Sequence, residues 1–152
     1  MHLPAWTGVA AAACVCLAWG EARAAEPPRE AVTGIGGFFF RAHDPAALEL
    51  WYQQHLGIAP VPKSYSQRPW AQEAGPTAFS PFPEASKYID AGKVWMLNFR
   101  VRNLDRMAAQ LRAEGVAVEV DPMTYPNGRF AHLHDPEGNP IELWEPKTPK
   151  SH

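Results

Sequence analysis

The feature that most constrains the fold of this chain is an internal repeat at an offset of 59 residues, from Phe40 to Phe99. The segment FRAHD at residues 40–44 aligns with FRVRN at residues 99–103, and the apolar residues Leu48 and Tyr52 fall on further apolar residues at the same offset. A repeat of this kind predicts two similar modules, because each copy must bury its apolar face against a neighbour.

Each copy has the pattern of a strand followed by a helix. In the first copy, residues 38–42 (FFFRA) are aromatic and predict a strand. Asp44 is a suitable N-cap, Pro45 suits the first helical position, and Gly57 is a suitable C-cap. Apolar residues recur at helical spacing between these signals. The first copy therefore predicts a strand and an amphipathic helix.

The second copy repeats this order. Residues 94–101 (VWMLNFRV) predict a strand, and a helix follows between Asn103 as N-cap and Gly115 as its end. Residues 116–120 predict a further short strand.

The last part of the chain, residues 129–146 (RFAHLHDPEGNPIELWEP), alternates, turns at DPEGN and alternates again. This pattern predicts a hairpin. With residues 135–139 as its loop, His134 pairs with Pro140 and His132 pairs with Glu142, with Cβ atoms about 5 Å apart.

These elements predict an α+β fold of two βαβββ modules that form a cupped mixed sheet, with residues 76–83 among the shorter strands of the first module. One helix covers one face of each module, and the opposite faces form a shared concavity. Residues 32–146 are expected to be one domain, with a linker at residues 25–31 and a C-terminal tail at residues 147–152.

Composition excludes one class of partner. The 152 residues are 46% hydrophobic and 20% charged, which is enough for a packed core. The net charge is −2 and no stripe of Lys or Arg is present, so nucleic acid is not an expected partner.

The N-terminus predicts a signal peptide at residues 1–24. Residues 3–19 are apolar and uncharged, and Ala22 and Ala24 fit the small-x-small rule for cleavage after Ala24. The apolar run is shorter than the roughly 20 residues of a membrane span, so we expect a periplasmic or secreted protein with no stable span after cleavage. No Lys or Arg precedes the run, which leaves an uncleaved anchor as the alternative. Cys14 and Cys16 lie in this segment, so residues 25–152 contain no disulfide and no thiolate site.

Strand alternation predicts which side chains face the concavity. Leu97, Phe99 and Val101 are apolar and should face the helix, as should Ile141 and Leu143 of the hairpin. Their neighbours along each strand then face the concavity. These inward-facing residues are Gly37, Phe39, Arg41, Met96, Asn98, Arg100, Glu142 and Trp144.

Three segments carry a family resemblance: FFFRAHDPAALELWYQQHLGI, MLNFRVRNLDRMAAQLRAEGV and RFAHLHDPEGNPIELWEP. Through them the chain resembles the vicinal oxygen chelate superfamily, which includes glyoxalases, bleomycin-resistance proteins and extradiol dioxygenases. The resemblance implies paired βαβββ modules, a cupped sheet that usually holds a divalent metal, and a homodimer.

The residues at the metal positions depart from that family pattern. The glutamate ligand implied by the resemblance falls on Glu142, but the two histidine positions fall on Gly37 and Met96. One carboxylate does not replace the three protein ligands that a catalytic metal normally needs. No metal and no other cofactor are therefore expected. A divalent metal held by Glu142 with His132 and His134 is the alternative.

A ligand site without metal is the simpler hypothesis. Arg41 and Arg100 occupy equivalent positions and could offer two guanidinium groups to an anion. The alternative for each arginine is a structural ion pair with Glu142 or a loop carboxylate. The other candidates are an amide and aromatic walls, namely Asn98, Phe39, Trp144 or Trp95, and Tyr125.

Three functions follow. The first is an exported protein that binds a small anionic or aromatic molecule without chemistry. The second is a glyoxalase-like lyase or isomerase, or a dioxygenase-type enzyme, that uses His132 and Glu142 as an acid–base pair, with or without a divalent metal. The cross-strand pair could instead be only structural. The third is a structural role in an assembly, with the concavity as a dimer interface.

Overall fold

The computed structural model describes residues 30–147. The chain divides into two compact units, Met1–Phe38 and Phe39–His152. In the first unit, residues 30–38 contain no helix or strand. The predicted signal peptide lies outside the described residues, as do most of the predicted linker and tail. Within residues 30–147, no helix is both long enough and apolar enough to cross a membrane.

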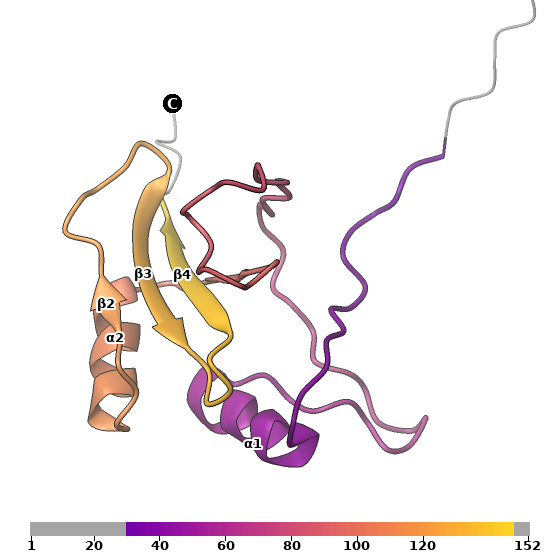
Figure 1. Ribbon diagram of the computed structural model, residues 1–152. Coiled ribbons are helices and arrows are strands. Elements are labelled where there is room, and N and C mark those ends of the chain that lie inside the picture. Colours follow the sequence, from indigo (N-terminus) through magenta and orange to yellow (C-terminus); the bar gives the residue numbers. More distant parts are fainter. Residues whose placement is uncertain (1–29, 148–152) are drawn as a thin grey trace, which may run out of the picture. The chain divides into compact units, whose positions relative to one another are not determined.

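The second unit contains one complete βαβββ module (Figure 1). Its four-stranded mixed sheet has the order β1-β4-β3-β2, with β1 parallel to β4 and the other pairs antiparallel. The elements are β1 Leu97–Arg100, α2 Leu104–Ala113, β2 Glu119–Val120, β3 Gly128–His134 and β4 Pro140–Pro146. The chain therefore has the predicted α+β fold.

The register of the closing hairpin is the predicted one. His132 pairs with Glu142, and His134 pairs with Pro140. The parallel pairing of β1 then places Asn98 beside Glu142 on its other side. Because directly paired residues point to the same face of a sheet, this register brings polar side chains of several strands together.

Helix α1, Pro45–Leu56, and helix α2 confirm the repeat. The two helices begin 59 residues apart, at Pro45 and Leu104. The Asp44 carboxylate accepts a hydrogen bond from the Ala47 amide at 3.1 Å, and Asn103 Oδ1 accepts one from the Arg106 amide at 2.8 Å. Equivalent caps therefore start equivalent helices, as the sequence predicts.

These caps give a first test. Replacing Asn103 by alanine should lower the free energy of unfolding by about 1 kcal/mol, because the Arg106 amide loses its acceptor. Urea unfolding measures this loss. Asn103→Ser keeps a capping oxygen and should change stability by only a few tenths of a kcal/mol. Equal losses for both variants would show that this cap does not stabilise α2.

The hydrophobic core lies between the helices and one face of the sheet. Leu104 and Leu111 of α2 are fully buried, as are Ile141 and Leu143 of β4. Phe99 and Val101 pack against this core, so the predicted helix-facing side of β1 is correct. Alternate residues of the same strands therefore point to the opposite, open face.

The loop between β3 and β4 connects α1 to the sheet. Asp135 is 4% exposed and accepts a hydrogen bond from the Tyr52 hydroxyl of α1 at 3.0 Å. It also accepts hydrogen bonds from the Glu137 amide and from both the backbone and the side chain of Asn139, at 2.8–2.9 Å. Burial and the neighbouring Asp135 carboxylate raise the pKa of Tyr52, so this hydroxyl remains a donor.

The predicted strands of the first module do not form. Residues 38–42 and 76–83 contain no strand, and all of residues 57–96 lie in turns and irregular loops. A strand requires a hydrogen-bonded neighbour, and no strand of the described residues pairs with β1 on its free side. Phe40 and Ala42 still pack against the core, which explains their apolar character. The predicted strands at residues 94–101 and 116–120 are shortened to β1 and β2.

Candidate functional site

A row of polar side chains crosses the open face of the sheet. The register pairs Asn98 with Glu142, Glu142 with His132, and His132 with Glu119. Each of the four strands therefore contributes one residue of the row. We call this set, Asn98, Glu142, His132 and Glu119, the polar row.

Glu142 is the buried member of the polar row. It is 3% exposed, and every donor that contacts it comes from a more exposed residue. Oε1 accepts a hydrogen bond from Asn98 Nδ2 at 2.7 Å, and Oε2 accepts one from the Tyr88 hydroxyl at 2.5 Å. His132 Nε2 lies 3.5 Å from Oε2. A buried carboxylate needs such partners, and here protein donors supply them in place of water.

The charges of Glu142 and His132 stabilise each other. Burial alone would raise the pKa of Glu142, but the hydrogen bonds from His132, Tyr88 and Asn98 outweigh it and hold the pKa below its usual range. The interaction with Glu142 raises the pKa of His132, although partial burial opposes this shift. The nearby carboxylates of Asp121 and Glu119 raise it further. The pair therefore favours a carboxylate beside an imidazolium.

This coupling predicts a pH dependence. Because the pKa of His132 is raised by folding, its contribution to stability is complete below the ordinary histidine pKa of about 6.5 and is lost as the pH rises through the raised value. The contribution should be at most about 1 kcal/mol, since His132 is 40% exposed. Glu142 has the opposite sign, and its contribution is lost in acid as the pH falls through its lowered pKa.

An NMR titration of the His132 ring tests the coupling. Glu142→Gln should lower the pKa of His132, since the variant removes the main cause of the shift. Glu137→Gln is the matched control, because Glu137 contacts the backbone amides of His43 and Asp44 instead. An unchanged His132 titration in Glu142→Gln would show that the two groups are not coupled.

Tyr88 belongs to the site and was not predicted from the sequence. Its ring stacks on Phe82 with centroids 5.1 Å apart and meets the His132 ring edge-on at 6.3 Å. Burial and the hydrogen bond to Glu142 raise the pKa of the Tyr88 hydroxyl, so it acts as a donor. Tyr88 lies in a proline-rich loop without periodicity, so no sequence signal placed it beside Glu142. Glu119 was also missed, because the sequence predicts a strand at residues 116–120 but not the pairing of this strand with β3.

Aromatic rings extend the open face beyond the polar row. Phe130 and Trp144 are paired across β3 and β4, with nearly parallel rings 6.3 Å apart. Tyr125 meets the Phe130 ring edge-on at 5.7 Å. The Trp144 indole donates to the Asn127 carbonyl, and the Tyr125 hydroxyl donates to Asp121. Two of the predicted wall residues, Trp144 and Tyr125, therefore contact Phe130, which lies two residues before His132 on the same face of β3.

The predicted arginines are not brought together with Glu142. Arg100 donates from Nη2 to the Glu73 carbonyl at 2.7 Å, and its guanidinium lies so close to Gly75 that a side chain there would collide with it. Arg41 is exposed and makes no hydrogen bond or ion pair with the described residues. Phe39 is 89% exposed. Arg100 thus holds a loop against β1. This is a structural role, as in the alternative to an anion site, although its partner is a backbone carbonyl instead of a carboxylate.

The donor set around Glu142 does not fit a metal ion. Both carboxylate oxygens accept hydrogen bonds from protein donors, and Met96 lies where a histidine ligand would be expected. His134 is directed to Asp90, with 2.5 Å between Nε2 and Oδ2. Within residues 30–147, no three His, Cys, Asp or Glu side chains are grouped to hold a metal.

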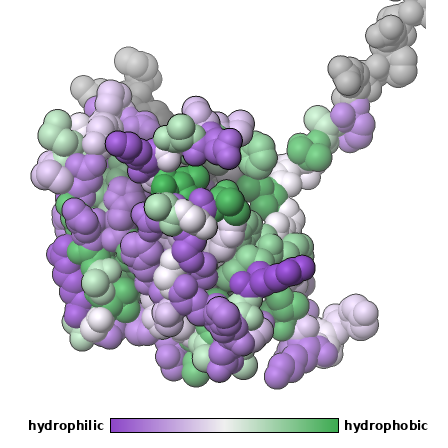
Figure 2. Space-filling view, viewed as in Figure 1, coloured by the Kyte–Doolittle hydropathy of each residue, from purple (hydrophilic) through white to green (hydrophobic). Residues whose placement is uncertain are grey.

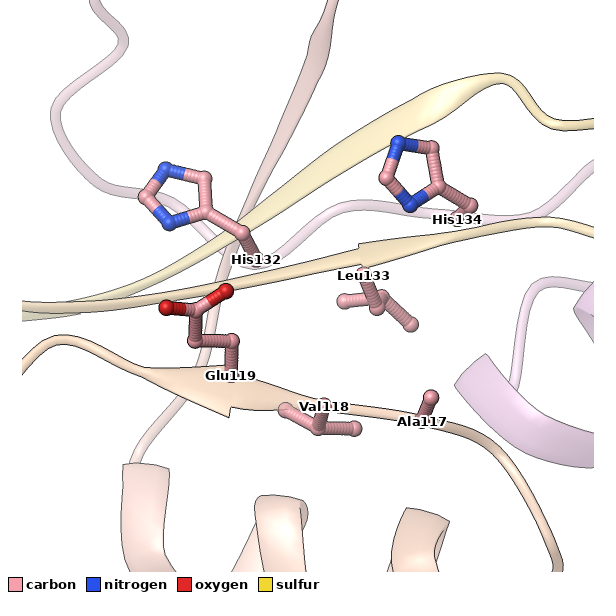
Figure 3. A pocket seen from close by; sticks show the side chains of 6 residues that line it. All are labelled: Ala117, Val118, Glu119, His132, Leu133 and His134. Atoms are coloured by element: carbon pink, nitrogen blue, oxygen red, sulfur yellow. The ribbon is translucent and has the colours of Figure 1, made fainter.

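A pocket of about 270 Å³ opens at the β2 edge of the polar row (Figure 3). Figure 3 shows the rings of His132 and His134 and the Glu119 carboxylate on one side of the strands, with Leu133 on the other. The pocket is lined by Ala117, Val118, Glu119, His132, Leu133 and His134. Figure 2 shows apolar side chains exposed among polar ones on this side of the molecule. Phe79 and Phe82, in the loops that precede β1, are among the exposed large hydrophobic residues.

Similar solved structures come from several bacteria. The antibiotic binding protein TnmS3 from Streptomyces sp. CB03234 is 41% identical over 34% of this chain and 41% of its own length, with a TM-score of 0.31. A glyoxalase/bleomycin resistance protein from the same organism is also 41% identical, over 32% of this chain and 42% of its own, with a TM-score of 0.30. This chain thus matches about two fifths of the length of each.

A longer match is to a lactoylglutathione lyase from Agrobacterium tumefaciens, which is 23% identical over 78% of this chain and 95% of its own, with a TM-score of 0.48. No curated protein matches the chain. The model of the glyoxalase-like domain matches residues 37–144, which is most of the chain and includes the whole polar row. The chain therefore belongs to the glyoxalase-like domain family of the vicinal oxygen chelate superfamily.

Proposed function

We propose that this protein binds a small aromatic molecule on the open face of its sheet, around Glu142, without a metal. The observation that carries this proposal is the set of donors on Glu142. Tyr88, Asn98 and His132 supply the contacts that a metal would otherwise supply, and all three are accessible to a ligand. The neighbouring rings of Phe130 and Trp144 offer apolar surface for a flat molecule.

An aromatic ligand fits the face better than an anionic one. The charged groups around His132 are the carboxylates of Glu142, Asp121 and Glu119. The nearest predicted cation, Arg100, already donates to a loop carbonyl. An anion would therefore meet more negative than positive charge on this face.

A lyase or isomerase is the second candidate, and the pair of His132 and Glu142 favours it. A protonated His132 beside a carboxylate could donate a proton to a bound ligand and recover it through the same ring. Proton transfer needs only this pair and a ligand within hydrogen-bonding distance. A binding protein and an enzyme would therefore use the same site, and they differ in whether the bound molecule is converted to a product.

A thermal-shift panel of aromatic acids, phenols and aromatic amines tests the proposal. A ligand at a hundredfold excess over its Kd should raise Tm by roughly 8 °C, from a stabilisation of about 2.7 kcal/mol. Products are then analysed after prolonged incubation. Stabilisation without product formation supports a binding protein, and turnover that is lost in His132→Gln supports the enzyme. A panel that gives neither would refute both candidates.

We also propose that the protein is exported and forms a homodimer. The apolar N-terminal segment with Ala22 and Ala24 supports export, and family resemblance supports the dimer. N-terminal sequencing of protein from the periplasm should begin at Ala25. Light scattering should give twice the mass of one mature chain. Retention in the membrane would instead indicate an uncleaved anchor.

A further inference from the structure

The hydroxyl of Tyr88 shows what kind of group Glu142 accepts. A phenol ring lies against Phe82, meets His132 edge-on and directs its hydroxyl to Oε2 of Glu142. The acceptor is buried and charged, whereas Tyr88 itself is 48% exposed. Tyr88 is an exposed loop residue, yet its hydroxyl donates to Glu142, the most buried acid of the open face.

The segment that carries Tyr88 can be displaced at low cost. Residues 83–93 contain no helix or strand and contribute no residue to the buried core. The segment is held by short-range contacts, such as the Ser86 hydroxyl that accepts from the Tyr88 amide, and by two long-range contacts near its end, the exposed pair of His134 and Asp90 and the hydrogen bond from Lys93 Nζ to Asn139 Oδ1 at 3.3 Å. Segments with few buried contacts and exposed hydrogen bonds open more readily than the core.

We propose that Glu142 is a receptor for an aromatic hydroxyl group, that Tyr88 fills this receptor in the free protein, and that a phenolic ligand binds by taking the place of Tyr88. This inference rests on the proposed function and names the ligand class for the same site. A ligand of this class stacks on Phe82, donates to Glu142 and needs no metal. Asn98 continues to donate to the other carboxylate oxygen.

Because Tyr88 occupies the ligand site in the free protein, it also lowers the apparent affinity of the protein for its ligand. A ligand binds only the fraction of molecules in which the site is open, so its apparent affinity falls by that fraction. A variant without the Tyr88 ring should bind a phenol more tightly than the wild type does. Tyr88 is then a specificity-determining residue, because a ligand without a hydroxyl cannot replace its contact with Glu142.

The test uses 4-methylphenol, which is the tyrosine side chain as a separate molecule. In Tyr88→Ala, isothermal titration should give an affinity for 4-methylphenol at least about tenfold higher than in the wild type. Toluene, which lacks the hydroxyl, should bind Tyr88→Ala at least about tenfold more weakly than 4-methylphenol. Adding Glu142→Gln to Tyr88→Ala should remove this preference.

Two further variants keep the test decisive. Tyr65→Ala removes another exposed phenol of the loops that precede β1, outside the polar row and its aromatic rings, and should bind 4-methylphenol as the wild type does. Tyr88→Phe keeps the ring but removes the hydrogen bond to Glu142 that holds the ring in the site. A ligand then displaces this ring more easily, so Tyr88→Phe should also gain affinity, which covers the case in which Tyr88→Ala fails to fold. Equal affinities for 4-methylphenol and toluene, or equal affinities of the wild type and both Tyr88 variants, would overturn the inference.

These outcomes separate the inference from the proposed function. If the panel finds a Glu142-dependent ligand without a hydroxyl, and Tyr88→Ala gains nothing for 4-methylphenol, the function stands and the inference is wrong. If Tyr88→Ala prefers 4-methylphenol to toluene through Glu142, while the wild type binds nothing in the panel, the inference stands and the proposed function is wrong.

Discussion

Replacing Asp135 by alanine is expected to lower the free energy of unfolding by about 3–4 kcal/mol. The Tyr52 hydroxyl and the Asn139 side chain both donate to this buried carboxylate, and each would lose its acceptor at a cost of about 1–3 kcal/mol. The same change removes one of the contacts between α1 and the β3–β4 loop. Urea unfolding with a linear extrapolation measures the effect.

Asp121→Ala is the control for this prediction. Asp121 also accepts from a backbone amide and a tyrosine hydroxyl, but the residues that donate, Met123 and Tyr125, are exposed and regain water. Asp121→Ala should therefore lower the free energy of unfolding by no more than about 1 kcal/mol. If both variants lost the same stability, the burial of the Asp135 network would not explain its contribution.

Glu142→Gln is expected to weaken ligand binding by about tenfold to a hundredfold, and to change the free energy of unfolding by less than about 1 kcal/mol. A hydrogen bond to a charged acceptor is worth about 1.5–3 kcal/mol, and glutamine keeps the shape of the side chain without its charge. The donors Tyr88 and His132 are partly exposed and can turn to water, so the folded state loses little. Isothermal titration with the strongest ligand of the panel measures the change in affinity.

A second variant separates the roles of charge and of contact. Asn98→Ala removes the donor to the other carboxylate oxygen of Glu142 and leaves the charge in place. Its effect on affinity should be smaller, at about threefold to tenfold, the change from one ordinary hydrogen bond. An affinity that survives Glu142→Gln unchanged would show that the ligand binds elsewhere.

The hairpin and the repeat were predictable because local patterns determine them. The turn at DPEGN fixes the register of His132 and Glu142, and equivalent caps at Asp44 and Asn103 fix the two helix starts. Both depend on residues that are close in the sequence. The same holds for the apolar side of β1, where alternation alone places Phe99 on the core.

The first module and the loop contacts were not predictable in this way. Residues 38–42 have a strand-like composition, but pairing depends on a neighbouring strand far away in the sequence, and none is present among the described residues. The contact of Tyr88 with Glu142 joins residues 54 positions apart through an irregular loop. Arg100 faces the predicted side of β1, yet the backbone of a loop, rather than a ligand, determines its partner.

The most direct test of the central claim is the affinity of the strongest ligand for protein treated with a chelator, compared with protein supplied with an equimolar divalent metal. The central claim is that the ligand binds without a metal at the group formed by Glu142 and its donors Tyr88, Asn98 and His132. The ligand either contacts these donors or takes the place of one of them. The claim predicts the same Kd, within about twofold, in both samples. Binding that is lost in chelator and restored by the metal would contradict it.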